Sequence, residues 1–302
     1  QDGSTDRRGL TPKDLIGTAF LAYDAKLMCQ IAAAIGEEDD SGRFDKLYKD
    51  TQIAFINRFI TPEGLMAGQT QTGYVLALYF DLVPDELRAE ITEALVKDIV
   101  ANRKMHMSTG FVGTPYINQV LTDIGRLDLA YTLLLQKSFP SWLYSVVHGA
   151  TTIWERWDGW TEENGFQDPG MNSFNHYAYG AVGTWMYENI IGIRTHPKNP
   201  GFKHIILQPR VGGDLDYARG VYHSPYGPIK SHWRIKDDVF IWEVSIPPNT
   251  SATTHIPAES QTHIFEGESP IEEADGVSFV RQTHESVVFK LQSGSYRFIV
   301  RN

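Results

Sequence analysis

The chain has 302 residues, a formal net charge of −10 at pH 7 and a single cysteine. Its length suits one large domain or two ordinary ones, with room for a sizeable core. The acidic balance argues against a nucleic-acid partner, because no surplus of lysine and arginine is available to neutralise phosphates. One cysteine alone excludes an internal disulfide.

The two ends of the chain carry no obvious targeting signal. It begins at Gln1 without a methionine or a signal sequence, which favours a processed or truncated N-terminus and leaves the compartment open. No apolar run approaches the roughly 20 residues needed to cross a bilayer, so no membrane partner is expected.

Up to about Ile193 the apolar residues have helical spacing. The first helix is expected to begin at residues 11–14, where Thr11 can cap it, and to stop at Gly36. No heptad persists, so the pattern predicts helix after helix rather than a coiled coil. Further helices are predicted over 42–59, 70–82, 85–104, 115–124, 126–138 and 173–191.

After Gly192 the period of the apolar residues changes to two. Phe240, Trp242, Val244 and Ile246 alternate with outward positions, which predicts a half-buried strand whose four side chains share one core.

Similar alternation occurs at 287–291 and 296–300, and turns rich in Gly, Pro, Asn and Ser separate the runs. The stretch HPKNPG at 196–201 marks the predicted boundary. We therefore expect an α domain over 1–195 and a small antiparallel β domain over 196–302.

The stretch from Thr151 to Tyr179 carries the residues that best indicate chemistry. It combines tryptophans, carboxylates and one histidine with too much Gly, Asn and Asp for an ordinary helix. Aromatic faces cover the apolar C–H side of a sugar ring, and carboxylates accept hydroxyl protons or activate water. The stretch predicts a site for a sugar.

Glu155 is the leading carboxylate of this stretch, because Trp154 and Trp157 flank it. A carboxylate in such an apolar setting usually has a task that compensates its desolvation. The alternative is an ion pair with Arg156 or with another arginine at a loop, and the residues alone leave both readings open. Glu155 is expected in a cleft lined by Trp154, Trp157 or Trp160, and all three tryptophans are candidate substrate-binding residues.

The other carboxylates of the stretch have simpler readings. Glu162 and Glu163 fit a solvated loop. Asp168 is followed by Pro and Gly and can hold a turn through its side chain.

His176 is predicted just inside the last helix, where Asn172 or Ser173 can cap. A helix N-terminus disfavours a positive imidazole, so a neutral histidine that bonds a sugar hydroxyl is one reading. A packed or capping histidine is the other.

Several classes of site have no support in the sequence. There is no HExxH, HxH or Cys/His cluster with ligand spacing, and no phosphate-binding glycine loop or GxSxG elbow. We expect no metal and no cofactor.

The chain resembles the C-terminal part of a bacterial α-L-rhamnosidase of glycoside hydrolase family 78. The resemblance runs nearly end to end, and the combination of TTIWERW with NHYAYG is the most specific part. It implies a partial (α/α)6 barrel followed by a C-terminal β-sandwich, and inverting hydrolysis of terminal α-L-rhamnosides. The matching stretches lie at 11–28, 109–144, 149–160, 172–193, 224–233 and 246–257.

The resemblance also assigns roles to two residues. Glu155 matches the general base of the family, and His176 matches the histidine that hydrogen-bonds the bound rhamnose. The expected partner is a rhamnose-containing glycoside or oligosaccharide.

The chain departs from the family in one respect that bears on activity. The family's general acid, a glutamate in a DERxGW-like motif, has no match, and the seven or eight predicted helices fall short of twelve. We expect a fragment that is a poor catalyst by itself, whose barrel a companion segment or a second copy completes. The alternatives are a non-catalytic carbohydrate-binding remnant, a purely structural remnant, and a different (α/α)6 glycosidase.

Overall fold

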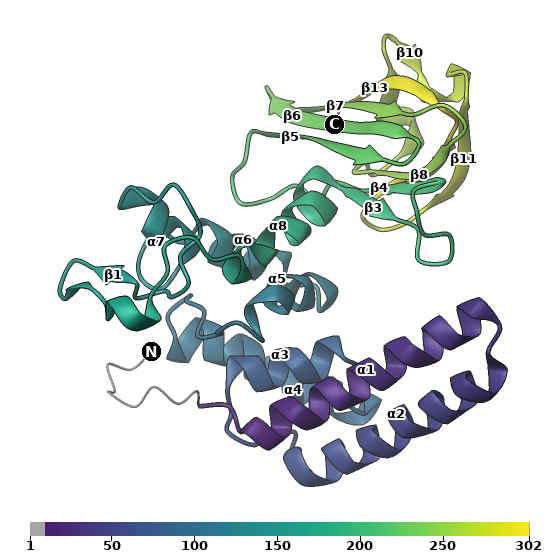
Figure 1. Cartoon of the computed structure of the whole chain (residues 1–302). Coiled ribbons are helices and arrows are strands. Elements are labelled where there is room, and N and C mark those ends of the chain that lie inside the picture. The colour runs from purple at the N-terminus through teal and green to yellow at the C-terminus, as the bar shows by residue number, and fades with distance from the viewer. Residues whose placement is uncertain (1–9, 302) are drawn as a thin grey trace. The chain divides into compact units, whose positions relative to one another are not determined.

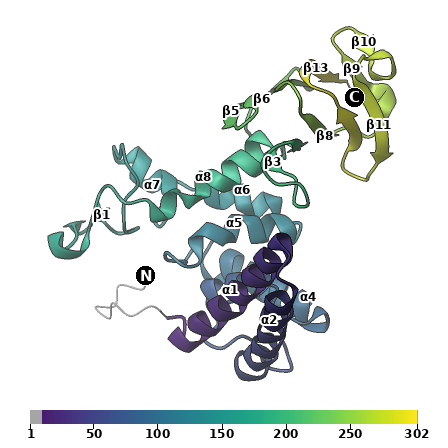
Figure 2. The same ribbon diagram turned by 45° about the vertical axis from the view of Figure 1, so that its right-hand side comes forward.

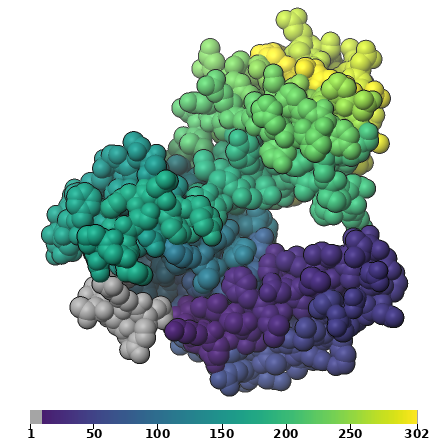
Figure 3. Space-filling model, viewed as in Figure 1, coloured from purple at the N-terminus to yellow at the C-terminus, as the bar shows by residue number. Residues whose placement is uncertain are grey.

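The structure is a computed structural model that describes residues 10–301. The chain divides into two compact units, Gln1–Val182 and Gly183–Asn302. The first is mainly helical and the second is mainly β-sheet (Figure 1). Figure 3 shows one face of the molecular surface, with the helical unit in purple to teal and the β-sheet unit in green to yellow.

The helices of the first unit follow the predicted order. Six of the seven predicted helices are confirmed to within a few residues, and short 3-10 or π-helical turns extend some of them. The helices are α1 (Lys13–Ile35), α2 (Glu38–Phe59), α3 (Gln71–Tyr79), α4 (Arg88–Lys97), α5 (Thr114–Asp123), α6 (Leu127–Leu135), α7 (Trp142–Val147) and α8 (Val182–Trp185).

These helices form two rows. α1 contacts α3, α3 contacts α5, and α5 contacts the short turn Ala178–Ala181. α2, α4 and α6 each pack on the helix that precedes them, and Figure 2 shows α1 and α2 side by side. An inner row of alternate helices backed by an outer row is the arrangement of an (α/α)6 barrel, of which this unit forms a part.

The first helix ends as predicted but begins differently. Gly36 adopts a left-handed conformation with φ of 83°, and its N–H bonds back to the last turn of α1, as a glycine stop requires. α1 begins after Pro12, and Thr11 does not cap it. The Thr11 hydroxyl instead lies 2.7 Å from the Thr70 hydroxyl.

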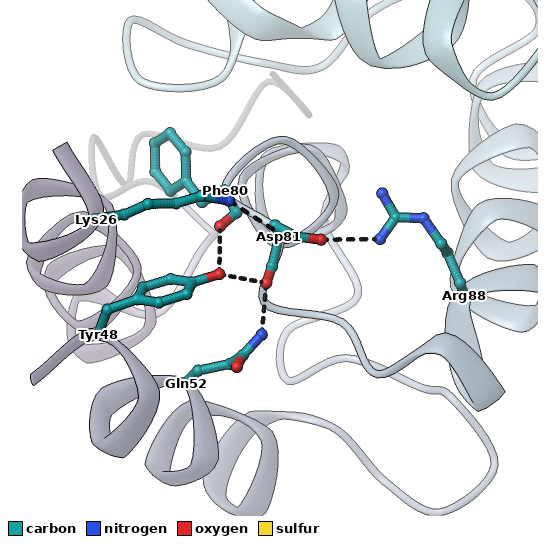
Figure 4. A network of polar contacts seen from close by, with 6 residues as sticks. All are labelled: Lys26, Tyr48, Gln52, Phe80, Asp81 and Arg88. Carbon is teal, nitrogen blue, oxygen red and sulfur yellow. Dashed lines mark hydrogen bonds and ion pairs between the residues drawn. The ribbon is translucent and has the colours of Figure 1, made fainter. Parts of the chain in front are cut away.

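A polar network around Asp81 joins the α1/α2 hairpin to the end of α3 (Figure 4). The Asp81 carbonyl accepts hydrogen bonds from Tyr48 Oη at 2.9 Å and Gln52 Nε2 at 2.6 Å. Its carboxylate forms ion pairs with Lys26 and Arg88. Burial and the Asp81 charge raise the pKa of Tyr48 to about 12, so its hydroxyl remains a donor.

Two features of this unit differ from the predictions. α7 was not predicted, because Trp142–Val147 is short and rich in aromatic and β-branched residues that also suit a strand. The predicted helix over 173–191 begins only at Ala178. Residues 173–176 instead hydrogen-bond to residues 152–155, which satisfies some of their backbone groups without a helix.

α1 is apolar around most of its circumference. By length and composition it is the one described helix that could span a membrane, which corrects the expectation that no apolar run approaches that length. Its packing against α2 and α3 gives it a place in the barrel. Leu21, Met28, Ile31 and Ile35 nevertheless remain 41–70% exposed.

The second unit is a β-sandwich of two sheets. Their orders are β10-β9-β13-β7-β6-β5 and β11-β12-β8-β4-β3. All neighbouring strands within the described chain are antiparallel except β4 and β8, which run parallel. The strands are β3 (Ile193–Thr195), β4 (His204–Leu207), β5 (Tyr217–Ser224), β6 (Gly227–Lys236), β7 (Val239–Ile246), β8 (Ser251–Ile256), β9 (Ile264–Glu266), β10 (Ser269–Pro270), β11 (Val277–Gln282), β12 (Val287–Leu291) and β13 (Gly294–Val300).

The predicted register of β7 is confirmed. Phe240, Trp242, Val244 and Ile246 are all at most 8% exposed and face one core. A chain of buried hydrogen bonds runs through this core, from the Trp242 indole to Ser231 Oγ at 2.9 Å and from Ser231 Oγ to the Ile191 carbonyl at 2.7 Å.

The division of the chain falls near the predicted boundary. The compact units separate at Val182, whereas β3, at residues 193–195, already pairs with β4 in the sandwich. The boundary at 195/196 stays a prediction of where the two domains separate.

Candidate functional site

The candidate site is built by two irregular segments, 152–155 and 173–176, that hydrogen bonds join side by side. Glu155 N–H donates to the Ser173 carbonyl at 2.8 Å, and His176 N–H donates to the Ile153 carbonyl at 2.9 Å. The Thr152 hydroxyl donates to the Phe174 carbonyl. These main-chain bonds bring Glu155 and His176, which are 21 positions apart, into one local structure.

The two oxygens of the half-buried Glu155 carboxylate differ in their surroundings. Oε2 accepts a hydrogen bond from the Ser173 N–H at 2.8 Å. Within residues 10–301, Oε1 has no hydrogen-bond partner. One oxygen is therefore held in place while the other is free to accept a proton.

Arg156 does not pair with Glu155, so the alternative reading of Glu155 as half of that ion pair is wrong. Its guanidinium donates two bonds of 2.9 Å to the Asp158 carboxylate, the bidentate geometry that best suits the two groups. These bonds raise the pKa of Arg156, and the charges of Asp158 and Glu155 act on it in the same direction.

Trp157 is fixed by its surroundings. Its indole N–H donates to the Thr109 carbonyl at 2.9 Å, and its ring stacks on Tyr179 with centroids 3.8 Å apart. The edge of Trp142 meets it at 5.5 Å, and Trp142 in turn donates to the Tyr179 carbonyl at 2.8 Å. Burial raises the pKa of Tyr179, so this buried phenol stays protonated.

The other two predicted tryptophans lie in different places. The ring of Trp154 meets the edge of Phe174 at 5.1 Å, close to the paired segments. Trp160 lies in β1 (Trp160–Thr161), which pairs with β2 (Gly165–Phe166), and contacts the His148 ring at 5.0 Å.

A small pocket lies among Trp142, Trp154, Arg156, Trp157 and Tyr179. It measures about 10 Å³, which is room for about one water molecule. Its lining includes neither Glu155 nor Trp160. Two of the three predicted tryptophans, Trp154 and Trp157, line this pocket, and the cleft around Glu155 stays a prediction.

The ring of His176 is held from two directions. It stacks against Phe111 at 4.9 Å and against Tyr177 at 5.3 Å, with interplanar angles of 11° and 10°. Its Nδ1 accepts from the Ala178 N–H at 3.3 Å. In the neutral ring the proton is therefore on Nε2, which is a donor with no partner among the described residues.

The predicted position of His176 inside a helix is wrong. It lies just before the helical turn Ala178–Ala181, and neither Asn172 nor Ser173 caps a helix there. The reason is the hydrogen bond of the His176 N–H to the Ile153 carbonyl, which takes up this N–H outside any helix.

The remaining carboxylates have the simpler roles that the sequence suggests. Glu162 has a side chain 78% exposed and bonds to His148 at 3.1 Å, and Glu163 is exposed. Asp168 Oδ1 accepts from the Gly170 N–H at 2.9 Å, which confirms the turn. Within the described residues, no three His, Cys, Asp or Glu side chains gather in a way that could hold a metal ion.

Sequence reasoning missed Phe111 and Tyr179. Both lie inside stretches that resemble the family, but a single aromatic residue gives no signal of its own. Their roles depend on contacts with residues 22 to 65 positions away, which neither periodicity nor spacing reveals.

Two family models match the chain. Residues 1–190 match the bacterial alpha-L-rhamnosidase 6 hairpin glycosidase domain, and residues 192–269 match the bacterial alpha-L-rhamnosidase C-terminal domain.

The chain is also similar to curated proteins. It is 42% identical over 290 residues to an alpha-L-rhamnosidase of Streptomyces avermitilis and 37% identical over 294 residues to one of Formosa agariphila. The alignments cover 96% and 97% of this chain but only 27% and 31% of those relatives. The chain thus spans less than a third of the length of either relative.

Solved structures agree in fold. The alpha-L-rhamnosidase of Streptomyces avermitilis complexed with L-rhamnose superposes with a TM-score of 0.89 at 41% identity, over 96% of this chain and 27% of that one. The enzyme from Aspergillus terreus gives a TM-score of 0.83 at 32% identity, over 97% and 31%. Since the six-hairpin model alone covers more than half of the sequence, the chain belongs to the bacterial alpha-L-rhamnosidase six-hairpin glycosidase family.

Proposed function

We propose that this chain supplies the general-base side of an inverting glycoside hydrolase acting on terminal α-L-rhamnosides. The observation that carries the proposal is the carboxylate of Glu155. One of its oxygens is held by the Ser173 N–H, and the other is free among the described residues. A general base needs this combination of fixed orientation and an unoccupied oxygen.

In this reaction Glu155 Oε1 removes a proton from a water molecule as that water attacks the anomeric carbon. A general acid on the opposite side protonates the leaving oxygen, and the two carboxyl groups stand roughly 6.5–9.5 Å apart to leave room for the water. The pairing of Arg156 with Asp158 supports the role, since Arg156 is then not bound to Glu155.

His176 fits the role of a sugar-binding donor. Its Nε2 carries the proton of the neutral ring, because Nδ1 accepts from Ala178. A neutral donor suits a sugar hydroxyl, which carries no charge. The relative from Streptomyces avermitilis was solved with L-rhamnose, which favours rhamnose as the sugar.

We also propose that the barrel is completed by a companion segment or a second copy. The support is the exposed apolar row Leu21, Met28, Ile31 and Ile35 on α1. Covering a few hundred Å² of such surface is worth several kcal/mol at about 25 cal/mol per Å². The carboxylates between 151 and 179 other than Glu155 already have the ion-pair, turn or solvated roles described above, so the general acid is expected in the companion.

The test uses a protein in which this chain is part of a completed barrel, with 4-nitrophenyl α-L-rhamnopyranoside as substrate. Glu155→Gln should lower kcat about 10²–10⁴-fold while KM stays within about tenfold, because the shape is kept and the base is removed. The matched control Glu162→Gln, on an exposed carboxylate of the same stretch, should keep kcat. Near-normal turnover by Glu155→Gln would reject the general-base role.

The 302-residue chain alone should hydrolyse the same substrate negligibly. Vigorous hydrolysis that disappears in Glu155→Gln would show that the acid lies within this chain. Asp168 and Glu163 would then be the first residues to substitute.

A further inference from the structure

The second unit contains a hollow of about 660 Å³ that the proposed reaction does not use. This volume lies within the range of ligand pockets in proteins, about 300–1,000 Å³. None of the described residues that line it is acidic, although the whole chain has a net charge of −10. Its polar lining includes Lys198, Asn199, Lys203, His204, Asn249 and Ser251.

The floor of the hollow lies where the parallel strands β4 and β8 begin. Their register places His204 beside Ser251, and the Ser251 N–H donates to the Lys203 carbonyl at 3.3 Å. Asn249 stands in the preceding turn with φ of 61°, and the buried Thr250 hydroxyl ties that turn to the Pro247 carbonyl at 2.7 Å. The floor is therefore set by strand register rather than by a free loop.

His204 makes this floor polar but uncharged. Its Nδ1 lies 2.8 Å from Ser251 Oγ, and its Nε2 lies 2.8 Å from Thr253 Oγ1. Burial, together with the nearby His196 and Lys290, lowers its pKa, so the ring is neutral at pH 7. A neutral ring donates to one hydroxyl and accepts from the other, which fixes the directions of both.

Two lysines provide the charge of the hollow. Lys198 is exposed and has no hydrogen bond or ion pair through its side chain within residues 10–301. Lys203 donates to the Asn249 carbonyl and lies over the Tyr226 ring, 5.1 Å from its centroid. Tyr226 is 41% exposed and is not one of the residues that line the hollow; it adjoins the hollow through its contact with Lys203.

We propose that this hollow binds a carboxylate-bearing sugar, such as a uronic acid unit of an oligosaccharide. The lysines match the carboxylate, and the Asn249 amide and the Ser251 hydroxyl match sugar hydroxyls. The Tyr226 ring, outside the lining but in contact with Lys203, offers an aromatic face to a pyranose that extends past that lysine. A neutral sugar would leave the lysines unused. A simple anion would leave the aromatic ring and the amides unused.

The hollow and the adjoining Tyr226 bring together two turns, at 224–228 and 247–251, to which the proposed reaction assigns no role. Tyr226 belongs to the SPYGP turn, and Asn249 and Ser251 belong to the PPNTS turn. Lys203 joins them, since it contacts both Tyr226 and Asn249.

The test is isothermal titration of the full 302-residue chain at low ionic strength. The probes are methyl β-D-glucopyranosiduronate, the neutral methyl β-D-glucopyranoside, sodium acetate and inorganic phosphate. The uronide should bind at least about tenfold more tightly than any other probe, equivalent to about 1.4 kcal/mol. No uronide binding, or acetate or phosphate binding equal to it, would overturn the proposal.

Matched variants locate the binding. Lys198→Gln should weaken uronide binding about five- to tenfold, whereas Lys236→Gln, the same charge change at the end of β6, should stay within about twofold. Equal loss in both would indicate diffuse charge attraction and overturn the site. Tyr226→Phe should retain affinity and Tyr226→Ala should lose it, with folding of each checked by circular dichroism.

One further variant separates this proposal from the proposed reaction. Glu155→Gln should bind the uronide as the unsubstituted chain does. Failure of the hollow to bind would leave the role of Glu155 untouched, and failure of the general-base assignment would leave the hollow untouched.

Discussion

The ring of His176 lies parallel to the ring of Phe111, with centroids 4.9 Å apart and planes 11° from each other. Phe111 is itself 44% exposed and makes an edge contact with Tyr179 at 5.4 Å. The stacking sets the plane of the imidazole, while the Ala178 N–H sets its tautomer. Phe111 therefore positions the Nε2 donor of His176.

Phe111→Leu is expected to weaken binding of L-rhamnose about fivefold, because the imidazole loses the flat surface that holds its plane. Phe111→Tyr keeps a ring and should stay within about twofold. Titration calorimetry on the completed barrel measures both, and Phe279→Leu, an exposed phenylalanine of the second unit, is the control. Unchanged affinity in Phe111→Leu would remove Phe111 from the site.

Ser231→Ala is expected to destabilise the second unit by about 1–3 kcal/mol. The change leaves the indole N–H of the fully buried Trp242 and the Ile191 carbonyl without the hydroxyl that joins them. Ser245→Ala removes a hydroxyl from the outer face of the neighbouring strand and should cost less than about 0.5 kcal/mol. Urea unfolding with an unchanged m-value measures the difference, and equal costs would contradict the role of the buried bonds.

His255 should make the second unit less stable in mild acid. Burial, and then the charges of Arg281, Arg194 and Arg210, lower its pKa from 6.5 to about 4, so the folded state holds the neutral ring. The unfolded chain takes up a proton near pH 6.5. The stabilising contribution is therefore present above pH 6.5 and is lost as the pH falls towards 4.

The size of this loss is about 1 kcal/mol, since solvent still screens the partly exposed ring. His255→Gln should flatten the dependence of unfolding free energy on pH between 6.5 and 4. His284→Gln, at an exposed histidine of the same unit, should leave the slope as it is. A slope that survives His255→Gln would assign the acid sensitivity to other groups.

Tyr48→Phe is expected to destabilise the first unit by about 1 kcal/mol, because the Asp81 carbonyl loses the hydroxyl donor at 2.9 Å. Lys26→Gln removes only a partly exposed ion pair to the same residue and should cost less than about 0.5 kcal/mol. Thermal unfolding of both variants measures how much each substitution lowers the stability of the first unit. A larger loss of stability in Lys26→Gln than in Tyr48→Phe would contradict the prediction that the hydrogen bond to the main chain matters more than the ion pair.

The sequence predicted those parts of the fold that depend on local features, such as the spacing of apolar residues or a glycine at a helix end. The alternation of Phe240, Trp242, Val244 and Ile246 sets which face of β7 is buried, and a one-residue slip would place these four side chains in water. Gly36 predicted the end of α1 for an equally local reason, because the left-handed conformation there favours glycine.

The candidate site depended on pairing that no local pattern shows. Asn172 and Ser173 look like helix caps, yet hydrogen bonds to Ile153 and Glu155 hold Ser173 and His176 outside a helix. Glu155 was found by resemblance and by its flanking tryptophans, but the Ser173 N–H that orients it is a main-chain group without a sequence signal.

The main-chain hydrogen bonds between 152–155 and 173–176 also distinguish two parts of the site, namely the bonded ends and the loop between them. Glu155 and His176 lie at the two ends of a loop, residues 156–172, and backbone hydrogen bonds hold these ends together. Side-chain contacts of Arg156 with Asp158, and of Trp157 with Tyr179, hold the first residues of the loop. Because backbone bonds are available to almost any residue, the register of the two ends does not depend on the side chains between them. The positions proposed for the base and for the sugar-binding donor therefore rest on backbone atoms rather than on the side chains that the loop presents.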